Sequence, residues 1–139
     1  MNLSVKSDYA ARAVLGLARR YPSENPMRVE DLAAEQEIPG NYLVQILNGL
    51  KAQGIARSVR GKSGGYLLAR PPGQITLGEV LRALHGAAFD TPALRDSTCP
   101  PELKAAWQHL QQAVDAAADA ITFQQLLADG AEKEKMYYI

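Results

Sequence analysis

The chain has a single cysteine, and this scarcity excludes several classes of site. One thiol cannot form an internal disulfide framework, and it cannot supply the several cysteines of a structural zinc site. Long apolar runs are also missing, since no stretch approaches the roughly 20 residues that span a bilayer. The N-terminal MNLSVKSDY lacks the apolar core of a signal peptide. The sequence therefore predicts a soluble, cytoplasmic protein that does not associate with a membrane.

Net charge is absent as well, because 15 basic residues balance 15 acidic ones. The signs are nevertheless separated: residues 1–72 hold ten Lys or Arg and six Asp or Glu, whereas residues 73–139 hold five and nine. No acidic residue occurs between Glu37 and Glu79. Five cations fall in that window: Lys51, Arg57, Arg60, Lys62 and Arg70. A polyanion responds to such a local window rather than to the sum, so we expect nucleic acid to bind there.

The same part of the chain has the pattern of a helix-turn-helix. Apolar residues at helical spacing predict helices over residues 7–21, 28–36 and about 41–53. Between the second and third helices, Pro39 and Gly40 are expected to end one helix and to permit a sharp entry into the next. The third helix has one apolar face, formed by Leu43, Ile46, Leu47 and Leu50. Its polar face is left free to contact a partner.

A β-hairpin is expected to follow these helices. Residues 55–59 and 66–70 have the length and composition of paired strands, and RGKSGG joins them. The three glycines of this connection allow positive φ and a close approach of the backbone. The fold class is therefore mainly α with a small β-hairpin: a winged helix-turn-helix DNA-binding domain over residues 1–73.

The second half is expected to hold a linker helix, a sensor loop and a dimerisation helix, over residues 74–130. Thr76 caps a helix at 75–85, residues 86–100 form a loop, and a long helix runs from Pro100 or Pro101 to about Ala120. A heptad pattern of six apolar residues runs along this long helix and ends just after it: Leu103, Trp107, Leu110, Val114, Ala117 and Ile121. We call these six the seam.

A seam on an otherwise polar helix needs a partner, which a symmetric homodimer supplies most simply. The alternative is that this helix packs on its own domain. A last short helix is expected to end at Gly130, and residues 131–139 form a tail that is frayed or docked only by its tyrosines.

The polar face of the third helix carries side chains suited to DNA bases and phosphates. Asn41 and Gln45 lie one turn apart, and amide side chains pair bidentately with adenine. The hydroxyl of Tyr42 can reach a phosphate, and Val44 can contact a thymine methyl. This helix is therefore expected to read sequence in the major groove.

The hairpin tip suits the neighbouring groove. Arg60 matches a narrow, A·T-rich minor groove, where the electrostatic potential is most negative. Lys62, Ser63 and Gly64 suit phosphates through an ammonium group and backbone N–H groups. An enzyme is not expected, because no set of nucleophile, base and orienting residue is visible.

Four segments together resemble the Rrf2 family of bacterial transcription regulators, over about residues 2–128. They are SVKSDYAARAVLGLA, YLVQILNGLKAQGI, SVRGKSGGYLLAR and ITFQQLL. The resemblance implies a winged helix-turn-helix with a long C-terminal dimerisation helix, acting as a two-fold dimer on palindromic operators. It assigns DNA contact to Asn41, Tyr42, Gln45 and Arg60. The protein is therefore expected to be a dimeric, sequence-specific transcriptional regulator that acts as a repressor. Its expected partner is double-stranded DNA that carries an A·T-containing palindrome.

Many members of that family hold an iron–sulfur cluster through three cysteines in the loop before the long helix. A partner subunit can add a fourth ligand, sometimes a carboxylate at the position of Asp8. This loop offers only Cys99, so the usual cluster is not expected and we predict no cofactor. An atypical metal or cluster site at the dimer interface, using Cys99, Asp8 or a histidine, stays open as an alternative.

Cys99 is the candidate sensor. It lies beside the N-terminus of the long helix, where the helix dipole favours a thiolate. One thiol per subunit can form an intersubunit disulfide or a sulfenic acid, so oxidation of Cys99 is the predicted signal. Two alternatives remain: Cys99 is inert, or the chain is a protein-interaction module that acts through a partner protein.

Overall fold

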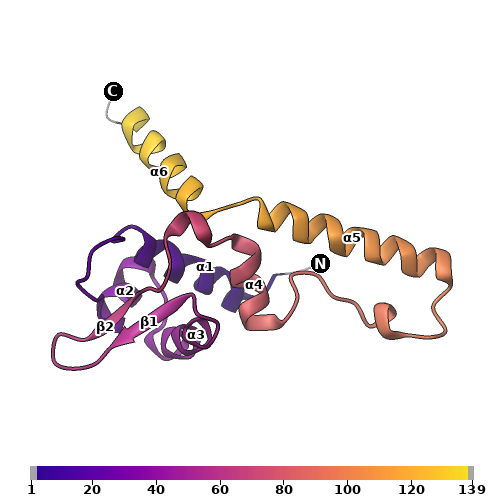
Figure 1. Ribbon diagram of the computed structural model, residues 1–139, viewed down its shortest axis with the longest axis horizontal. Coiled ribbons are helices and arrows are strands. Elements are labelled where there is room, and N and C mark those ends of the chain that lie inside the picture. The colour runs from indigo at the N-terminus through magenta and orange to yellow at the C-terminus, as the bar shows by residue number, and fades with distance from the viewer. Residues whose placement is uncertain (1–2, 138–139) are drawn as a thin grey trace.

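Helices dominate the computed structural model, which describes residues 3–137 and side chains as far as Glu134. Over this range it contains six α-helices and one β-hairpin (Figure 1), which confirms the expected fold class. The elements are α1 (Val5–Ala18), α2 (Val29–Gln36), α3 (Gly40–Ala52), β1 (Ala56–Val59), β2 (Gly65–Leu68), α4 (Leu77–His85), α5 (Pro101–Asp119) and α6 (Phe123–Tyr137), with short 3-10 turns at Pro72–Gln74 and Pro92–Arg95.

Helix α1 is the centre of the core, and it packs on α2, α3, α4, α6 and β2. Its buried stripe consists mostly of small residues, which let neighbouring helices approach closely: Ala10, Ala13, Val14, Gly16, Leu17 and Ala18. A Cβ at Gly16 would lie 2.6 Å from Cδ1 of Leu32 on α2.

Helix α1 begins and ends earlier than the sequence pattern indicated. The N-cap is Ser4, because its side chain accepts a hydrogen bond from the backbone N–H of Ser7, where the expected helix began. The helix ends at Ala18, so Tyr21 lies beyond it and is exposed rather than part of the inward stripe.

The turn between α2 and α3 is made by a residue that the sequence pattern did not single out. Glu37 adopts the left-handed conformation, with φ of 54°, while Gly40 is simply the first residue of α3. Ile38 plugs the core at the turn, and Pro39 precedes the helix without a side-chain cap. The expectation that Gly40 provides the sharp entry into the third helix is therefore wrong.

Helix α3 separates its two faces as expected. Leu43, Ile46, Leu47 and Leu50 are fully buried, while the polar face is exposed. Gly54 ends the helix with φ of 72°, the left-handed conformation that favours glycine.

Strands β1 and β2 form the wing, an antiparallel hairpin with Ala56 opposite Leu68 and Val59 opposite Gly65. The segment before α2 extends this sheet, because the backbones of Met27 and Tyr66 exchange two hydrogen bonds of 2.9 and 2.8 Å. Gly65 is required there, since a Cβ would overlap the Met27 carbonyl. The wing is thus held to the helix-turn-helix at its base and free at its tip.

The C-terminal helices differ in how they join the core. The α4 N-cap is Thr76, as expected, and α4 ends at Gly86 with φ of 76°. Helix α6 packs on α1 through the buried Phe123, and it continues past Gly130 to Tyr137. The expected stop at Gly130 is therefore wrong, and so is an irregular tail up to residue 137. Residues 138–139 and the side chain of Tyr137, on which the tyrosine docking depends, lie outside the described part.

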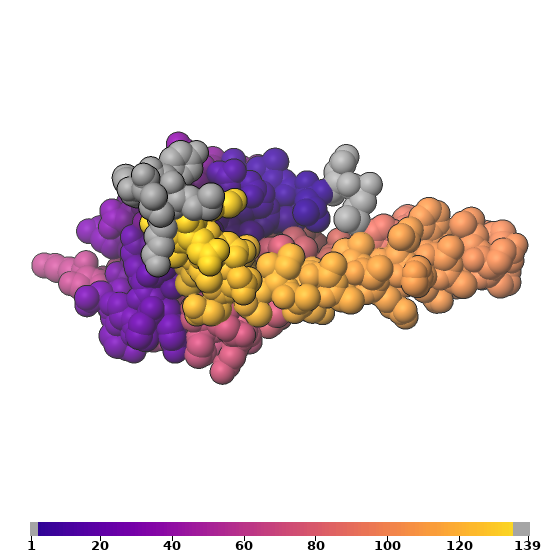
Figure 2. Space-filling view, turned by 90° about the horizontal axis from the view of Figure 1, so that it is seen from above, coloured from indigo at the N-terminus to yellow at the C-terminus, as the bar shows by residue number. Residues whose placement is uncertain are grey.

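Helix α5 extends away from the other helices and makes the molecule elongated (Figures 1 and 2). The C-terminal end of α5, near Asp119, lies against α4. The N-terminal end of α5 and the wing tip lie at opposite ends of the molecule. Within residues 3–137, no helix combines the length and the apolar content needed to cross a membrane.

Candidate nucleic-acid interface

The N-terminal end of α3 gathers the side chains expected to meet DNA. Asn41, Tyr42, Val44 and Gln45 are all exposed, and Asn41, Tyr42 and Gln45 together line a shallow surface hollow. Their grouping follows from α3 itself, because its buried leucine and isoleucine stripe turns this face outward. The structure therefore places three donors and acceptors side by side on the helix that a helix-turn-helix inserts into the major groove.

Tyr42 is braced by α1, a contact that the sequence pattern did not reveal. Its ring meets Tyr9 edge to face, with 6.0 Å between ring centroids. The guanidinium of Arg12 lies 5.8 Å from the Tyr9 ring centroid and 2.9 Å from the Asp8 carboxylate. The only signal in the sequence was the helical spacing of Asp8, Tyr9 and Arg12, which does not indicate a contact with a helix 30 residues away.

The wing tip exposes its cations. Arg60, Lys62 and Ser63 are exposed, and the N–H of Gly64 donates to the Gly61 carbonyl at 3.0 Å. Gly61 has φ of 113°, and a Cβ at Gly64 would overlap the Val59 carbonyl, so this turn needs both glycines. The tip projects from the same side of the molecule as α3 (Figure 1).

The five cations of the acid-free window divide into two groups. Arg57 pairs with Glu24 at 2.8 Å, and Arg70 pairs with Glu79 at 2.6 Å while also donating to two backbone carbonyls. Lys51, Arg60 and Lys62 are exposed, and within the described chain no carboxylate lies in ion-pair distance of them. Within this window, the cations without a carboxylate partner in the described chain are therefore two at the wing tip and one near the end of α3.

The seam is only partly covered within one chain. Leu103, Leu110, Ala117 and Ile121 are exposed, while Trp107 and Val114 are half-buried. The loop before α5 gives part of that cover, since the Gln111 side chain donates to the Phe89 carbonyl at 3.2 Å. The structure thus leaves most of the heptad stripe facing solvent.

Cys99 lies two residues before α5 and is half-buried, with its sulfur 3.7 Å from the Pro100 carbonyl. The neighbouring carboxylate of Asp96 is engaged locally: it accepts from the hydroxyl and backbone N–H of Thr98, which lower the pKa of Asp96. Asp8 is held by Arg12. In the described part of the chain, no three His, Cys, Asp or Glu side chains are grouped so as to hold a metal ion.

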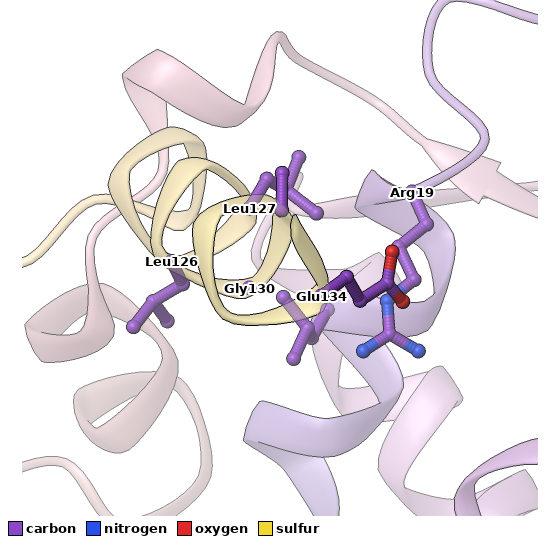
Figure 3. A pocket seen from close by; sticks show the side chains of 7 residues that line it. Arg19, Leu126, Leu127, Gly130 and Glu134 are labelled. Atoms are coloured by element: carbon purple, nitrogen blue, oxygen red, sulfur yellow. The ribbon is translucent and has the colours of Figure 1, made fainter. Parts of the chain in front are cut away.

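A separate open-sided cavity of about 250 Å³ lies where α6 packs against α1. Leucines of both helices line it, and the side chains of Arg19 and Glu134 lie at one end (Figure 3). None of the residues expected to contact DNA or to sense a signal lines this cavity.

Comparison with known proteins agrees with the geometry. The sequence model of the Rrf2 family, described as an iron-dependent transcriptional regulator, matches residues 3–129. The chain is 30% identical to the HTH-type transcriptional regulator CymR of Bacillus subtilis, covering 100% of each chain. It is 33% identical to the HTH-type transcriptional regulator IscR of Cronobacter sakazakii, covering 91% of this chain and 80% of that one.

Among solved structures, the chain resembles IscR of T. potens, with a TM-score of 0.80 and 30% identity over 99% of this chain and 97% of that one. These relatives are named as regulators, and the chain is accordingly not an enzyme.

The family description mentions iron, but this chain lacks the cysteines of the usual three-cysteine iron–sulfur site. Three thiolates from one subunit are needed for a three-cysteine cluster, and the chain has only Cys99, while Asp8 is paired with Arg12 and Asp96 is hydrogen-bonded to Thr98. Such a cluster does not fit this chain. With its winged helix-turn-helix, its exposed cations at the wing tip and a family match over nearly its whole length, the chain belongs to the Rrf2 family of DNA-binding transcriptional regulators.

Proposed function

We propose that the protein is a homodimeric, sequence-specific repressor that binds a palindromic operator containing A·T pairs. The observation that carries this proposal is the exposed group of Asn41, Tyr42 and Gln45 at the start of α3, together with a wing tip whose cations have no carboxylate partner in the described chain. Base-reading side chains and phosphate-binding cations on neighbouring elements are what major-groove recognition requires.

Helix α3 reads the sequence. With its first turn in the major groove, Asn41 and Gln45 each offer an acceptor and a donor to adenine, and Val44 offers a methyl contact to thymine. Tyr42, braced by Tyr9, orients the helix by donating its hydroxyl to a phosphate. Bracing matters because a side chain that is already held in place loses less conformational entropy on binding.

The wing anchors the domain on the adjoining groove. Arg60 enters a minor groove that is narrow over A·T pairs, and Lys62 with the backbone at Ser63 and Gly64 binds phosphates. Arg57 and Arg70 play no part in this contact, because each is engaged by a carboxylate of the protein.

The exposed seam supports the dimer. Two α5 helices packed along Leu103, Leu110 and Ile121 would cover apolar side chains that a single chain leaves 37–44% exposed. A two-fold axis through this contact gives two copies of α3, which then meet half-sites related by the same symmetry and about 34–36 Å apart. A dimer bound in this way blocks access to the DNA it covers, so repression is the expected outcome.

Control by Cys99 is the remaining part of the proposal. The sulfur lies in the loop between α4 and α5, where a change in its size or polarity acts on the start of α5. A peroxide is the oxidant class: the thiolate attacks one peroxide oxygen, the O–O bond breaks, cysteine sulfenic acid forms and the other oxygen leaves as hydroxide.

Replacing Gln45 by Ala should relax the operator sequence at one base pair per half-site, because the only amide at that position is removed. The expected loss of discrimination is about 1–3 kcal/mol at that base pair and nearly none elsewhere. Selection of bound duplexes from a randomised pool measures this directly. Gln53→Ala, at the exposed far end of α3, is the matched control. A protein-interaction module would select no sequence at all, and an unchanged preference would remove Gln45 from base reading.

Arg60→Ala should weaken binding most on operators whose flanks have narrow, A·T-rich minor grooves, since the guanidinium is stabilised by the strong negative potential there. Lys62→Ala is the control: it should weaken all sequences alike and should lower the salt dependence by about one counterion. Fluorescence anisotropy on A·T-flanked and G·C-flanked duplexes at two salt concentrations separates the two. Equal losses for Arg60→Ala on both duplexes would make Arg60 a phosphate contact.

Leu110→Asp should dissociate the dimer without unfolding the chain, because this side chain is 44% exposed in a single chain but buried in the proposed contact. Gln112→Asp introduces the same charge on the opposite, exposed face of α5 and should leave the dimer intact. Light scattering after gel filtration gives the mass, and circular dichroism checks the fold. A Leu110→Asp protein that keeps its dimer mass would contradict the seam as interface.

Treatment with hydrogen peroxide should lower operator affinity in the wild type, and a thiol reductant should restore it. Cys99→Ser should bind normally and be insensitive to the oxidant, since no other cysteine is present. Gel shifts paired with mass spectrometry of Cys99 check both points. Full oxidation of Cys99 with unchanged affinity would rule out the switch.

A further inference from the structure

We propose that Arg82 is a positioning residue that fixes the direction of α5 relative to the winged domain (residues 3–73). In the dimer, that direction sets the half-site spacing that the protein accepts. The first part concerns contacts within one chain, whereas the consequence for spacing rests on the proposed dimer.

One attachment of α5 is made by the backbone just after its last turn. Thr76 and Thr122 form an antiparallel bridge: the N–H of Leu77 donates to the Ile121 carbonyl at 2.8 Å, and the N–H of Phe123 donates to the Ile75 carbonyl at 3.1 Å. Phe123 is then fully buried in the core. This bridge fixes where α5 joins the segment between the winged domain and α4, but attachment at one end leaves the direction of a helix undetermined.

Arg82, on α4, supplies the second attachment. One guanidinium nitrogen lies 2.6 Å from Oδ1 of Asp119, and the other lies 3.4 Å from Oδ1 of Asp115, one turn earlier on α5. The hydrogen bond to Asp119 is the main cause that raises the pKa of Arg82 above its ordinary value. A planar fork that spans one helical turn restrains the axis of that turn, which a single point charge cannot do.

Gly78 lets the two helices approach closely enough for this contact. It is buried on the first turn of α4, and a Cβ there would overlap the Asp119 carboxylate. The hydroxyl of Thr76 also approaches that carboxylate, with 3.4 Å between Oγ1 and Oδ1. Three groups of α4 and its N-cap therefore lie against Asp119, whose side chain stays 44% exposed: the guanidinium of Arg82, the hydroxyl of Thr76 and the backbone at Gly78.

The other side of α4 is tied to the DNA-reading elements. Glu79, three residues before Arg82, pairs with Arg70 at 2.6 Å. Arg70 in turn donates to the Gly54 carbonyl at the end of α3, at 3.3 Å. A continuous series of contacts thus runs from the end of α3 through Arg70 and α4 to α5. The direction of α5 is therefore fixed relative to α3, the helix proposed to read the bases.

A small change at this joint is magnified along α5. A helix of 19 residues is about 28 Å long, so a rotation of about 10° at Asp119 moves its far end by about 5 Å. One base pair changes the separation of two half-sites by about 3.4 Å and their relative rotation by about 35°. The direction of α5 therefore decides which spacing both copies of α3 can meet together.

The first test measures the direction of α5 within one chain. Spin labels at Ala34→Cys on α2 and Gln108→Cys on α5, both exposed, are placed in a Cys99→Ser background, and the labelled chain is diluted into unlabelled chain. Double electron–electron resonance gives the distance distribution. Arg82→Gln should lower the population at the native distance, relative to the population at displaced distances, roughly two- to fivefold. That range is the one expected for loss of a half-exposed ion pair.

Three further variants make the result specific. Asp119→Asn should act in the same direction while preserving size, and it replaces Arg82→Gln should that protein fail to fold. Arg82→Lys should recover part of the native distance, because it keeps the charge but not the fork. Arg95→Gln removes an exposed pair with Asp90, at 2.8 and 3.0 Å within the loop, and should change nothing. Distributions for Arg82→Gln and Asp119→Asn that match the wild type would overturn the proposal.

The second test uses a series of palindromes that differ only in the spacing between their half-sites. The spacings are the preferred one, one base pair shorter, one base pair longer and two base pairs longer. Wild type and Arg95→Gln should bind best at one spacing, and Arg82→Gln should reduce that preference roughly two- to fivefold. If the wild type is monomeric or indifferent to spacing, the proposed dimeric function fails, while the intrachain distances still decide the role of Arg82. A displaced α5 with an unchanged spacing preference would overturn the link to operator choice.

Discussion

The close packing of α1 against its neighbours is the constraint on which the rest of the structure depends. Because alanines and glycine occupy the buried stripe of α1, α2 and α3 can both lie directly against it. The angle between those two helices sets how α3 is presented for the proposed contact with DNA. The same helix also positions Tyr9 beside Tyr42, so the central core helix contributes to the reading surface as well as to its support.

Charge in this protein is divided by use rather than by position in the chain. Arg57, Arg70 and Arg82 each hold two parts of the fold together through a carboxylate. Arg60 and Lys62 at the wing tip have no such carboxylate in the described chain and remain available to phosphates. A formal net charge of zero is therefore compatible with DNA binding, because the acids lie at structural joints and on the C-terminal half.

The two ends of α5 have different tasks. At its C-terminal end, the backbone bridge at Thr122 and the side chain of Asp119 attach it to α4 and the segment just before α4. Further along, its apolar residues stay exposed, which suits the proposed contact with a second copy. Cys99 lies just before this helix, at the end opposite to the attachment, so the proposed oxidation would act near the proposed interface rather than near the proposed DNA contact.

The sequence by itself determined the helices, the wing, the buried stripe and exposed face of α3, and the apolar pattern of α5. These features follow from periodicity and from glycine or capping residues, which are local properties of the chain. Only the tertiary structure decided that Glu37 rather than Gly40 makes the turn and that α6 continues through Gly130. It also decided which arginines are engaged and that Tyr9 braces Tyr42. The physical reason is that a cation, a ring or a helix end takes its role from the groups folded against it, and those groups lie far away in the sequence.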